Sequence, residues 1–123
     1  MMNVIRASRA GFCMGVALAL RKLDSMVAAR EGEQVDTLGE IIHNPQVLED
    51  YARKGVRRLG SASEAEADMA VLIRAHGITR SMEEELRGRC ARVEDATCPR
   101  VKKAQLAIAE ATAAGCELLL YGE

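Results

Sequence analysis

The sequence feature that most constrains the fold is an alternation of short apolar runs with longer segments of helical periodicity. Val16, Leu20, Leu23 and Val27 repeat at the spacing of one helix face. We expect helices over residues 15–31, 45–55, 81–89 and 99–114. We expect strands over residues 3–7, 34–38, 56–59, 70–74, 91–94 and 117–121. This order favours an α/β fold with a mostly parallel sheet and helices on both faces.

Local signals mark where several of these helices begin and end. Asn44 followed by Pro45 is typical of an N-cap and a first helical residue. Ser81 and Glu84 have the spacing of a capping box. Gly115 follows the last periodic segment, where a glycine commonly ends a helix.

Composition argues against several classes of function. Aromatic residues make up only 2 % of the chain and the net charge is −1, so a base-stacking or strongly basic nucleic-acid surface is not expected. No apolar run approaches the length of a membrane span, and Arg6 and Arg9 interrupt any signal-peptide core. We therefore expect no nucleic-acid or membrane partner and a reducing, cytoplasmic setting for the four cysteines.

Four chemically reactive side chains fall in the loops that lead from expected strands into expected helices. Cys13, His43, His76 and Cys98 each lie in one such loop. The carboxyl ends of parallel strands meet at one edge of a sheet, so these four side chains should converge there. Helix N-termini at the same edge favour an anionic ligand such as phosphate or diphosphate.

Other polar and thiol side chains have simpler interpretations. A single histidine in a loop is usually only solvated, so the argument depends on all four side chains lying at one edge. Cys90 and Cys116 are interpreted as small buried apolar residues at strand edges. Lys102 and Lys103 are interpreted as part of a solvated helix face.

The chain also resembles the N-terminal part of the IspH/LytB family of hydroxymethylbutenyl diphosphate reductases. The resemblance rests on four motifs within residues 10–103, namely A-G-F-C-M-G-V, I-I-H-N-P-Q-V, R-A-H-G-I and E-D-A-T-C-P-R-V-K-K. It implies that Cys13 and Cys98 are two of three cysteines that hold a 4Fe-4S iron–sulfur cluster. It implies that His43 and His76 bind the substrate diphosphate.

The same resemblance implies an activity and a larger architecture. Family members reductively remove an allylic hydroxyl to give isopentenyl and dimethylallyl diphosphates, with electrons from ferredoxin or flavodoxin. They have three α/β lobes, of which residues 1–96 would form the first and residues 97–123 would begin the second. The strand at 3–7 would pair with the last lobe.

The family's third cluster cysteine and its proton-handling residues have no counterpart in these 123 residues. We therefore expect no catalytic residue within this chain and no turnover by the chain alone. The apolar edge expected at 117–121 predicts self-association.

Three other interpretations stay open from the residues alone. The two cysteines and two histidines could form a tetrahedral Cys₂His₂ zinc module. A cysteine and a histidine could form the nucleophilic pair of a hydrolase or acyl transferase. The chain could also be a phosphate-binding α/β domain without enzymatic activity.

Overall fold

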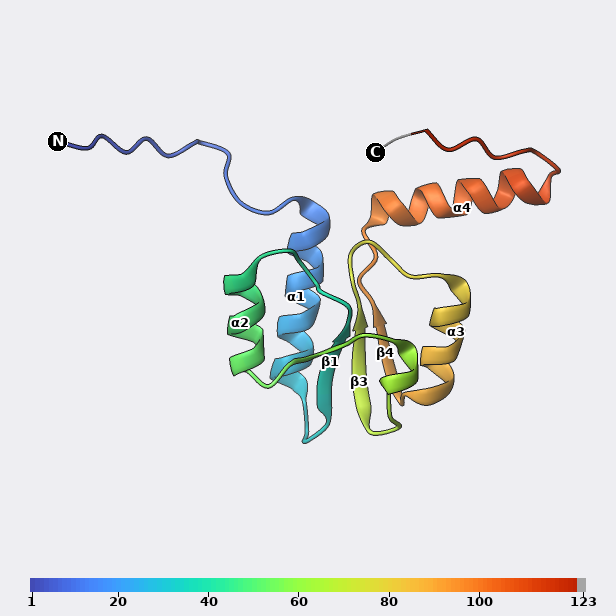
Figure 1. The fold of residues 1–123 in the computed structure, drawn as a ribbon, viewed down its shortest axis with the longest axis horizontal. Helices are drawn as coiled ribbons and strands as arrows, with labels where there is room; N and C mark the ends of the chain where they lie inside the picture. Colours follow the sequence, from blue (N-terminus) through green and yellow to red (C-terminus); the bar gives the residue numbers. More distant parts are fainter. Residues whose placement is uncertain (122–123) are drawn as a thin grey trace.

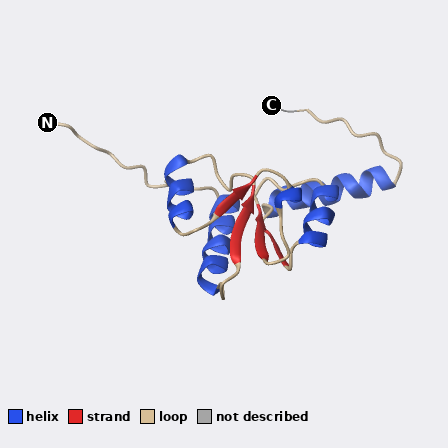
Figure 2. Ribbon diagram, turned by 60° about the horizontal axis from the view of Figure 1, so that its bottom comes forward, coloured by secondary structure: helices blue, strands red, loops and turns tan. Residues whose placement is uncertain are grey.

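The computed structural model describes residues 1–121, which contain a parallel sheet flanked by helices (Figures 1 and 2). The elements follow in the order α1 (Met14–Ala29), β1 (Gln34–Leu38), α2 (Pro45–Arg53), β2 (Arg57–Leu59), the short 3₁₀ helix η1 (Ala62–Glu64), β3 (Met69–Ile73), α3 (Arg80–Arg89), β4 (Arg92–Asp95) and α4 (Pro99–Ala113). The expected α/β class with a parallel sheet is confirmed.

The sheet has the strand order β2-β1-β3-β4, and all neighbouring strands are parallel. Leu38 at the end of β1 aligns with Leu59 of β2 and Ile73 of β3, and Ile73 aligns with Asp95 of β4. All four strands therefore end on one line, and the loops that follow them share one edge of the sheet.

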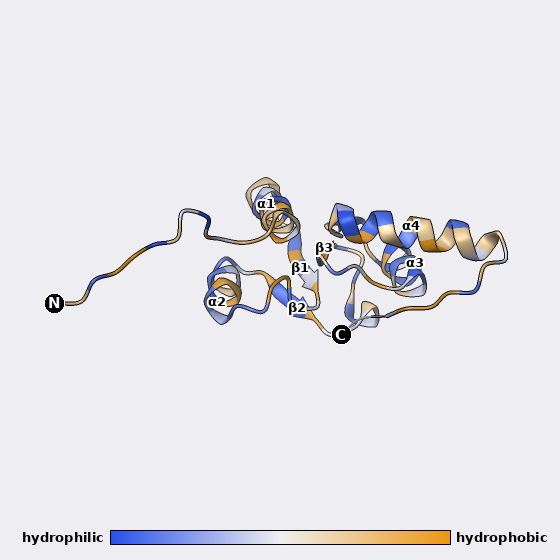
Figure 3. Cartoon of the chain, turned by 90° about the horizontal axis from the view of Figure 1, so that it is seen from above, coloured by the Kyte–Doolittle hydropathy of each residue, from blue (hydrophilic) through white to orange (hydrophobic). Residues whose placement is uncertain are grey.

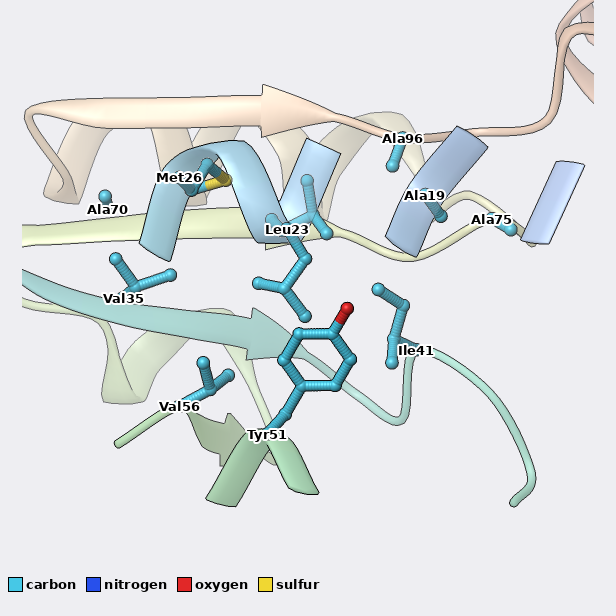
Figure 4. Packing of buried hydrophobic residues seen from close by; sticks show 11 residues of the cluster. Ala19, Leu23, Met26, Val35, Ile41, Tyr51, Val56, Ala70, Ala75 and Ala96 are labelled. Atoms are coloured by element: carbon cyan, nitrogen blue, oxygen red, sulfur yellow. The ribbon is translucent and has the colours of Figure 1, made fainter. Parts of the chain in front are cut away.

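Helices cover both faces of the sheet, as the sequence predicts. On one face Leu23, Met26 and Tyr51 of α1 and α2 pack against Val35 and neighbouring strand residues (Figure 4). On the other face the buried cluster contains Leu38, Leu59, Ala62, Ala65, Met69, Val71, Ile73, Leu86 and Cys90. Every residue of β3 is buried, because this central strand is covered on both sides.

One carboxylate lies inside this core. Asp36 of β1 is fully buried and accepts hydrogen bonds from Arg57 through Nε at 3.1 Å and Nη2 at 2.9 Å. The hydrogen bond and the charge of Asp36 raise the pKa of Arg57. A buried carboxylate needs such a partner, so this pair fixes the register of β2 beside β1.

The two ends of the described chain do not join the sheet. Residues 3–7 and 117–121 were expected to form strands, and both expectations are wrong: these residues are irregular and exposed (Figure 1). A strand needs a neighbour for its backbone hydrogen bonds, and no described strand pairs with either segment. Residues 122–123 of the expected second segment, 97–123, lie outside the described residues.

Two smaller predictions also fail. Cys116 is exposed rather than buried, since the strand that would have covered it is absent. The cap of α3 is Thr79, whose hydroxyl accepts from the Met82 backbone N–H at 3.4 Å. The capping box lies instead in η1, between Ser61 and Glu64.

α4 extends away from the sheet and has no fully buried residue, and hydrophobic and hydrophilic residues are interspersed along it (Figure 3). No helix within residues 1–121 has the length and apolar character needed to cross a membrane.

Candidate functional site

All four long helices begin at the edge where the strands end (Figure 1). Their N-caps are Cys13, Asn44, Thr79 and Cys98. His43 comes directly before the Asn44 cap, and His76 lies three residues before the Thr79 cap. The expected convergence is therefore observed in outline, since each candidate residue sits at or next to a helix start.

The strand order explains why the two histidines meet. From β1 the chain passes through α2 to β2 on one side, and from β3 it passes through α3 to β4 on the other side. Such a reversal leaves a crevice between the carboxyl ends of the two central strands, where α/β proteins bind ligands. The loops at this crevice carry His43 and His76, whose ring centroids lie 6.1 Å apart at an interplanar angle of 32°.

Both imidazoles are accessible from solvent. His43 has a side chain that is 74 % exposed, and its Nδ1 lies 3.0 Å from Glu40 Oε2. Glu40 also pairs with Arg58 at the end of β2. This contact orients the His43 ring through Nδ1 and leaves Nε2 available for a ligand.

A cationic group near the two histidines, Arg74, was not singled out from the sequence, although it lies in the R-A-H-G-I motif. The guanidinium of Arg74 lies against the loop after β1, where a Cβ at Gly39 would be 3.1 Å from Arg74 Nη1. Its Nε is buried without a hydrogen-bond partner among the described residues. Arg74 and His76 line the same hollow of about 490 Å³. A guanidinium and an imidazole that line one hollow favour an anion there.

The two cysteines at this edge of the sheet, which we call the rim, lie at the starts of α1 and α4, and the start of α1 contacts Cys98. A Cβ added at Gly15 would lie only 2.7 Å from Cys98 Sγ and 2.9 Å from Cys98 Cβ. The first turn of α1, which follows Cys13, is therefore packed against Cys98. Neither cysteine side chain makes a capping hydrogen bond, so both sulfurs are free to bind another group.

Backbone contacts connect the cysteine side of the rim to the histidine side. The Cys98 N–H donates to the Ala75 carbonyl at 2.8 Å, and Ala75 precedes His76. The order along the rim is thus the start of α1, Cys98, His76 and His43. Two separate hollows lie along the rim. Cys13 lines one of about 530 Å³, and His76 lines the other.

The geometry does not support the zinc or the nucleophile interpretation. Within residues 1–121, no group of three or more His, Cys, Asp or Glu side chains is close enough to hold a metal ion. Among the same residues no hydrogen bond joins a cysteine to a histidine; the recorded partner of His43 is Glu40. The rim therefore separates into a thiol pair and an imidazole pair.

The remaining cysteines lie away from the rim, as expected. Cys90 follows α3 and is buried; burial, with a contribution from Asp36, raises the pKa of its thiol although Arg89 opposes the shift. Cys116 follows the far end of α4. Neither is placed to join the thiol pair. A hollow of about 590 Å³ beside α2 and β2 has mainly apolar walls and is lined by none of Cys13, His43, His76 and Cys98.

Comparison with known proteins decides the family. The family model described as LytB protein matches residues 4–123. The chain belongs to the LytB family. Its curated LytB relatives include the 4-hydroxy-3-methylbut-2-enyl diphosphate reductase of Nitratidesulfovibrio vulgaris strain DP4, with 57 % identity over 99 % of this chain and 45 % of that relative. The chain thus spans about half the length of the curated relatives it matches.

Solved LytB structures agree with the fold. A structure of (E)-4-hydroxy-3-methyl-but-2-enyl diphosphate reductase, described as the terminal enzyme of the non-mevalonate pathway, superposes with a TM-score of 0.82 at 39 % identity. It is matched over all of this chain and 43 % of its own. The Plasmodium falciparum reductase superposes with a TM-score of 0.79 over 87 % of this chain and 33 % of its own. Its 21 % identity supports the fold alone.

Proposed function

We propose that this LytB chain forms the diphosphate-binding and part of the cluster-binding side of a 4-hydroxy-3-methylbut-2-enyl diphosphate reductase. The observation that carries the proposal is the 6.1 Å separation of the His43 and His76 rings at the crevice between β1 and β3. The relatives named above carry that activity in their names. The reaction breaks a carbon–oxygen bond, consumes two electrons and two protons, and releases the hydroxyl as water.

The histidine side of the rim suits the diphosphate end of the substrate. His43 and His76 offer N–H donors, and α2 and α3 direct the positive ends of their helix dipoles to the same edge. Arg74 adds a permanent positive charge, which a neutral imidazole does not supply. Two phosphates bearing several negative charges need such donors from more than one loop.

The thiol side suits an iron–sulfur cluster. Cys13 and Cys98 offer two unbonded sulfurs on adjoining helix starts, and thiolates are the ligands that hold such clusters. When bound, the cluster supplies the electrons and an iron site with affinity for the substrate hydroxyl. We place the third thiolate outside residues 1–121, because Cys90 and Cys116 lie away from the rim. The electron donor would be ferredoxin or flavodoxin, in a reducing cytoplasm consistent with four unpaired cysteines.

This division of the site predicts what the chain can do alone. It should bind a diphosphate group through its histidine side. It should not reduce the substrate, because its rim provides only two thiols and the described residues contain no complete metal site.

Binding of inorganic diphosphate, measured by titration calorimetry, tests the proposal. We expect His43→Ala and His76→Ala each to weaken binding by about tenfold, which corresponds to the loss of one hydrogen bond to a charged ligand. Arg53→Gln removes a positive charge at the opposite end of α2 and should leave the affinity within about twofold. Failure of diphosphate to bind, or equal loss in all three variants, would contradict the proposal.

A further inference from the structure

Asp95 holds together the turn that leads from β4 into α4. Its Oδ1 accepts from the Thr97 backbone N–H at 2.8 Å and from the Thr97 hydroxyl. Its Oδ2 accepts from Lys102 Nζ at 3.1 Å, one turn inside α4. A carboxylate that accepts from the N–H two residues ahead closes an Asx turn. The end of the strand and the first turn of the helix are thus joined by one side chain, with Cys98 between them.

The same turn is attached to α1, the helix that begins at Cys13. Lys22 Nζ, two turns into α1, donates to the Asp95 carbonyl at 2.6 Å. The first turn of α1 contacts Cys98 directly at Gly15, where a Cβ would lie 2.7 Å from Cys98 Sγ. Only a glycine permits this approach, because Cβ atoms do not come so close to their neighbours without a shift of the structure.

The electrostatics favour a turn that is closed at neutral pH. Burial alone would raise the pKa of Asp95, but the hydrogen bonds from Thr97 and Lys102 hold it below its ordinary value. The ionised carboxylate is the form that accepts from all three donors. Lys102 was interpreted from the sequence as part of a solvated face, and the structure gives it this specific partner instead.

We propose that Asp95 and Gly15 are positioning residues that set the separation between the thiols of Cys13 and Cys98. The Asp95 side chain fixes Cys98 between the end of β4 and the first turn of α4, and Gly15 lets the start of α1 approach Cys98. Neither residue needs to touch the bound group. The inference rests on the proposed function in one respect, namely that the two cysteines bind the same group.

Amide hydrogen exchange at Cys98 gives a readout that requires no bound group. The Cys98 N–H donates to the Ala75 carbonyl, so its exchange reports whether the turn is closed. We expect Asp95→Ala to speed exchange at Cys98 by about tenfold relative to the amides of β1 and β3, and Asp95→Asn, which keeps an acceptor, to speed it less. Gly15→Ala should also speed it. Gly88→Ala is the matched control, because a Cβ there meets nothing within 4 Å. Uniform acceleration at all amides, or no acceleration at Cys98, would overturn the proposal.

A trivalent arsenical, phenylarsine oxide, tests the thiol separation itself. It bridges two nearby thiols with release of water, and a Cys116→Ser background removes the exposed thiol at the end of α4. We expect bridging of Cys13 to Cys98 in this background, and a roughly tenfold weaker affinity after Asp95→Ala or Gly15→Ala but not after Gly88→Ala. Absence of bridging in the background itself would count against the shared ligand and so against the proposed function. Bridging that Asp95→Ala and Gly15→Ala leave unchanged would overturn the positioning role alone.

Discussion

Large apolar side chains differ in solvent exposure between the body of the protein, residues 15–98, and its terminal segments, residues 1–14 and 99–121. Leu23, Leu72 and Leu86 in the body are fully buried. The exposed large apolar side chains among the described residues all lie in the terminal segments: Met1, Met2, Val4, Ile5, Phe12, Met14, Leu106, Leu118, Leu119, Leu120 and Tyr121. The body satisfies its own packing, whereas the terminal segments present surfaces suited to contact with further protein.

This difference also divides the candidate site. His43 and His76 belong to loops of the body, and the sheet itself determines their separation. Cys13 and Cys98 lie where the body meets the terminal segments, and their separation depends on contacts between α1 and the start of α4. The sheet of the body therefore positions the two histidines. The two cysteines are positioned where the body meets the terminal segments.

The largest difference between the body and the terminal segments should appear in the free energy of unfolding, when a substitution in the core is compared with one in a terminal segment. Leu23→Ala removes a fully buried side chain and should lower the free energy of unfolding by about 3 kcal/mol. Leu119→Ala, at a side chain that is 93 % exposed, should change it by less than about 0.5 kcal/mol. Urea unfolding of both variants measures the difference. Similar losses in the two variants would show that residues 99–121 are part of the folded core.

A smaller effect should appear in the association of the chain with itself. The apolar run at Leu118, Leu119 and Leu120 has no partner among the described residues and should form contacts between copies at micromolar concentrations. Leu119→Asp should shift the mass toward the monomer, and Ser81→Asp, the same change of charge on exposed α3, should not. Light-scattering chromatography measures the mass. A monomer at every micromolar concentration of the unsubstituted chain would contradict this prediction.

The smallest effect should be the pH dependence of the stabilisation that Asp95 gives to the turn between β4 and α4. The pKa of Asp95 is lowered from its ordinary value of 3.8 in the folded protein, so the unfolded chain takes up this proton first as the pH falls. The stabilisation from Asp95 is therefore present above that ordinary value and lost as the pH falls through the lower folded value. Asp95→Asn should cost about 1 kcal/mol at neutral pH and less at about pH 3, which is below the ordinary pKa of 3.8. Urea unfolding at both pH values measures this; a cost independent of pH would contradict the charge argument.

The sequence predicts the body better than the ends, for a physical reason. The expected strand at 34–38 coincides with β1, in which Val35, Asp36, Thr37 and Leu38 are all buried. The strands expected at 3–7 and 117–121 have suitable residues, but a strand exists only with a neighbour, and sequence windows do not report neighbours. The cap of α3 was misplaced because Thr79 and Ser81 are both good caps and the turn after Gly77 selects between them.

The site was predictable to the level of one sheet edge. Four loop residues before four expected helices indicate a shared rim, although the strand expected before Cys13 does not form. The adjacency of His43 and His76 depends on the strand order, which local sequence does not specify. Arg74 and Asp95 were missed as functional candidates because their roles depend on contacts. The Nε of Arg74 is buried without a hydrogen-bond partner among the described residues, and the Asp95 carboxylate accepts hydrogen bonds from Thr97 and from Lys102 of α4. The roles of Cys13, Cys98, His43 and His76 stay predictions.

The most direct test of the account is a nuclear magnetic resonance titration of the two imidazoles with inorganic diphosphate. The chain has only two histidines, so His43→Gln assigns both ring signals. If one anion lies between rings 6.1 Å apart, both sets of signals should shift along a single binding curve, and His76→Gln should weaken the response of His43. Shifts with different midpoints, or a response from only one ring, would contradict a shared diphosphate site at this edge of the sheet.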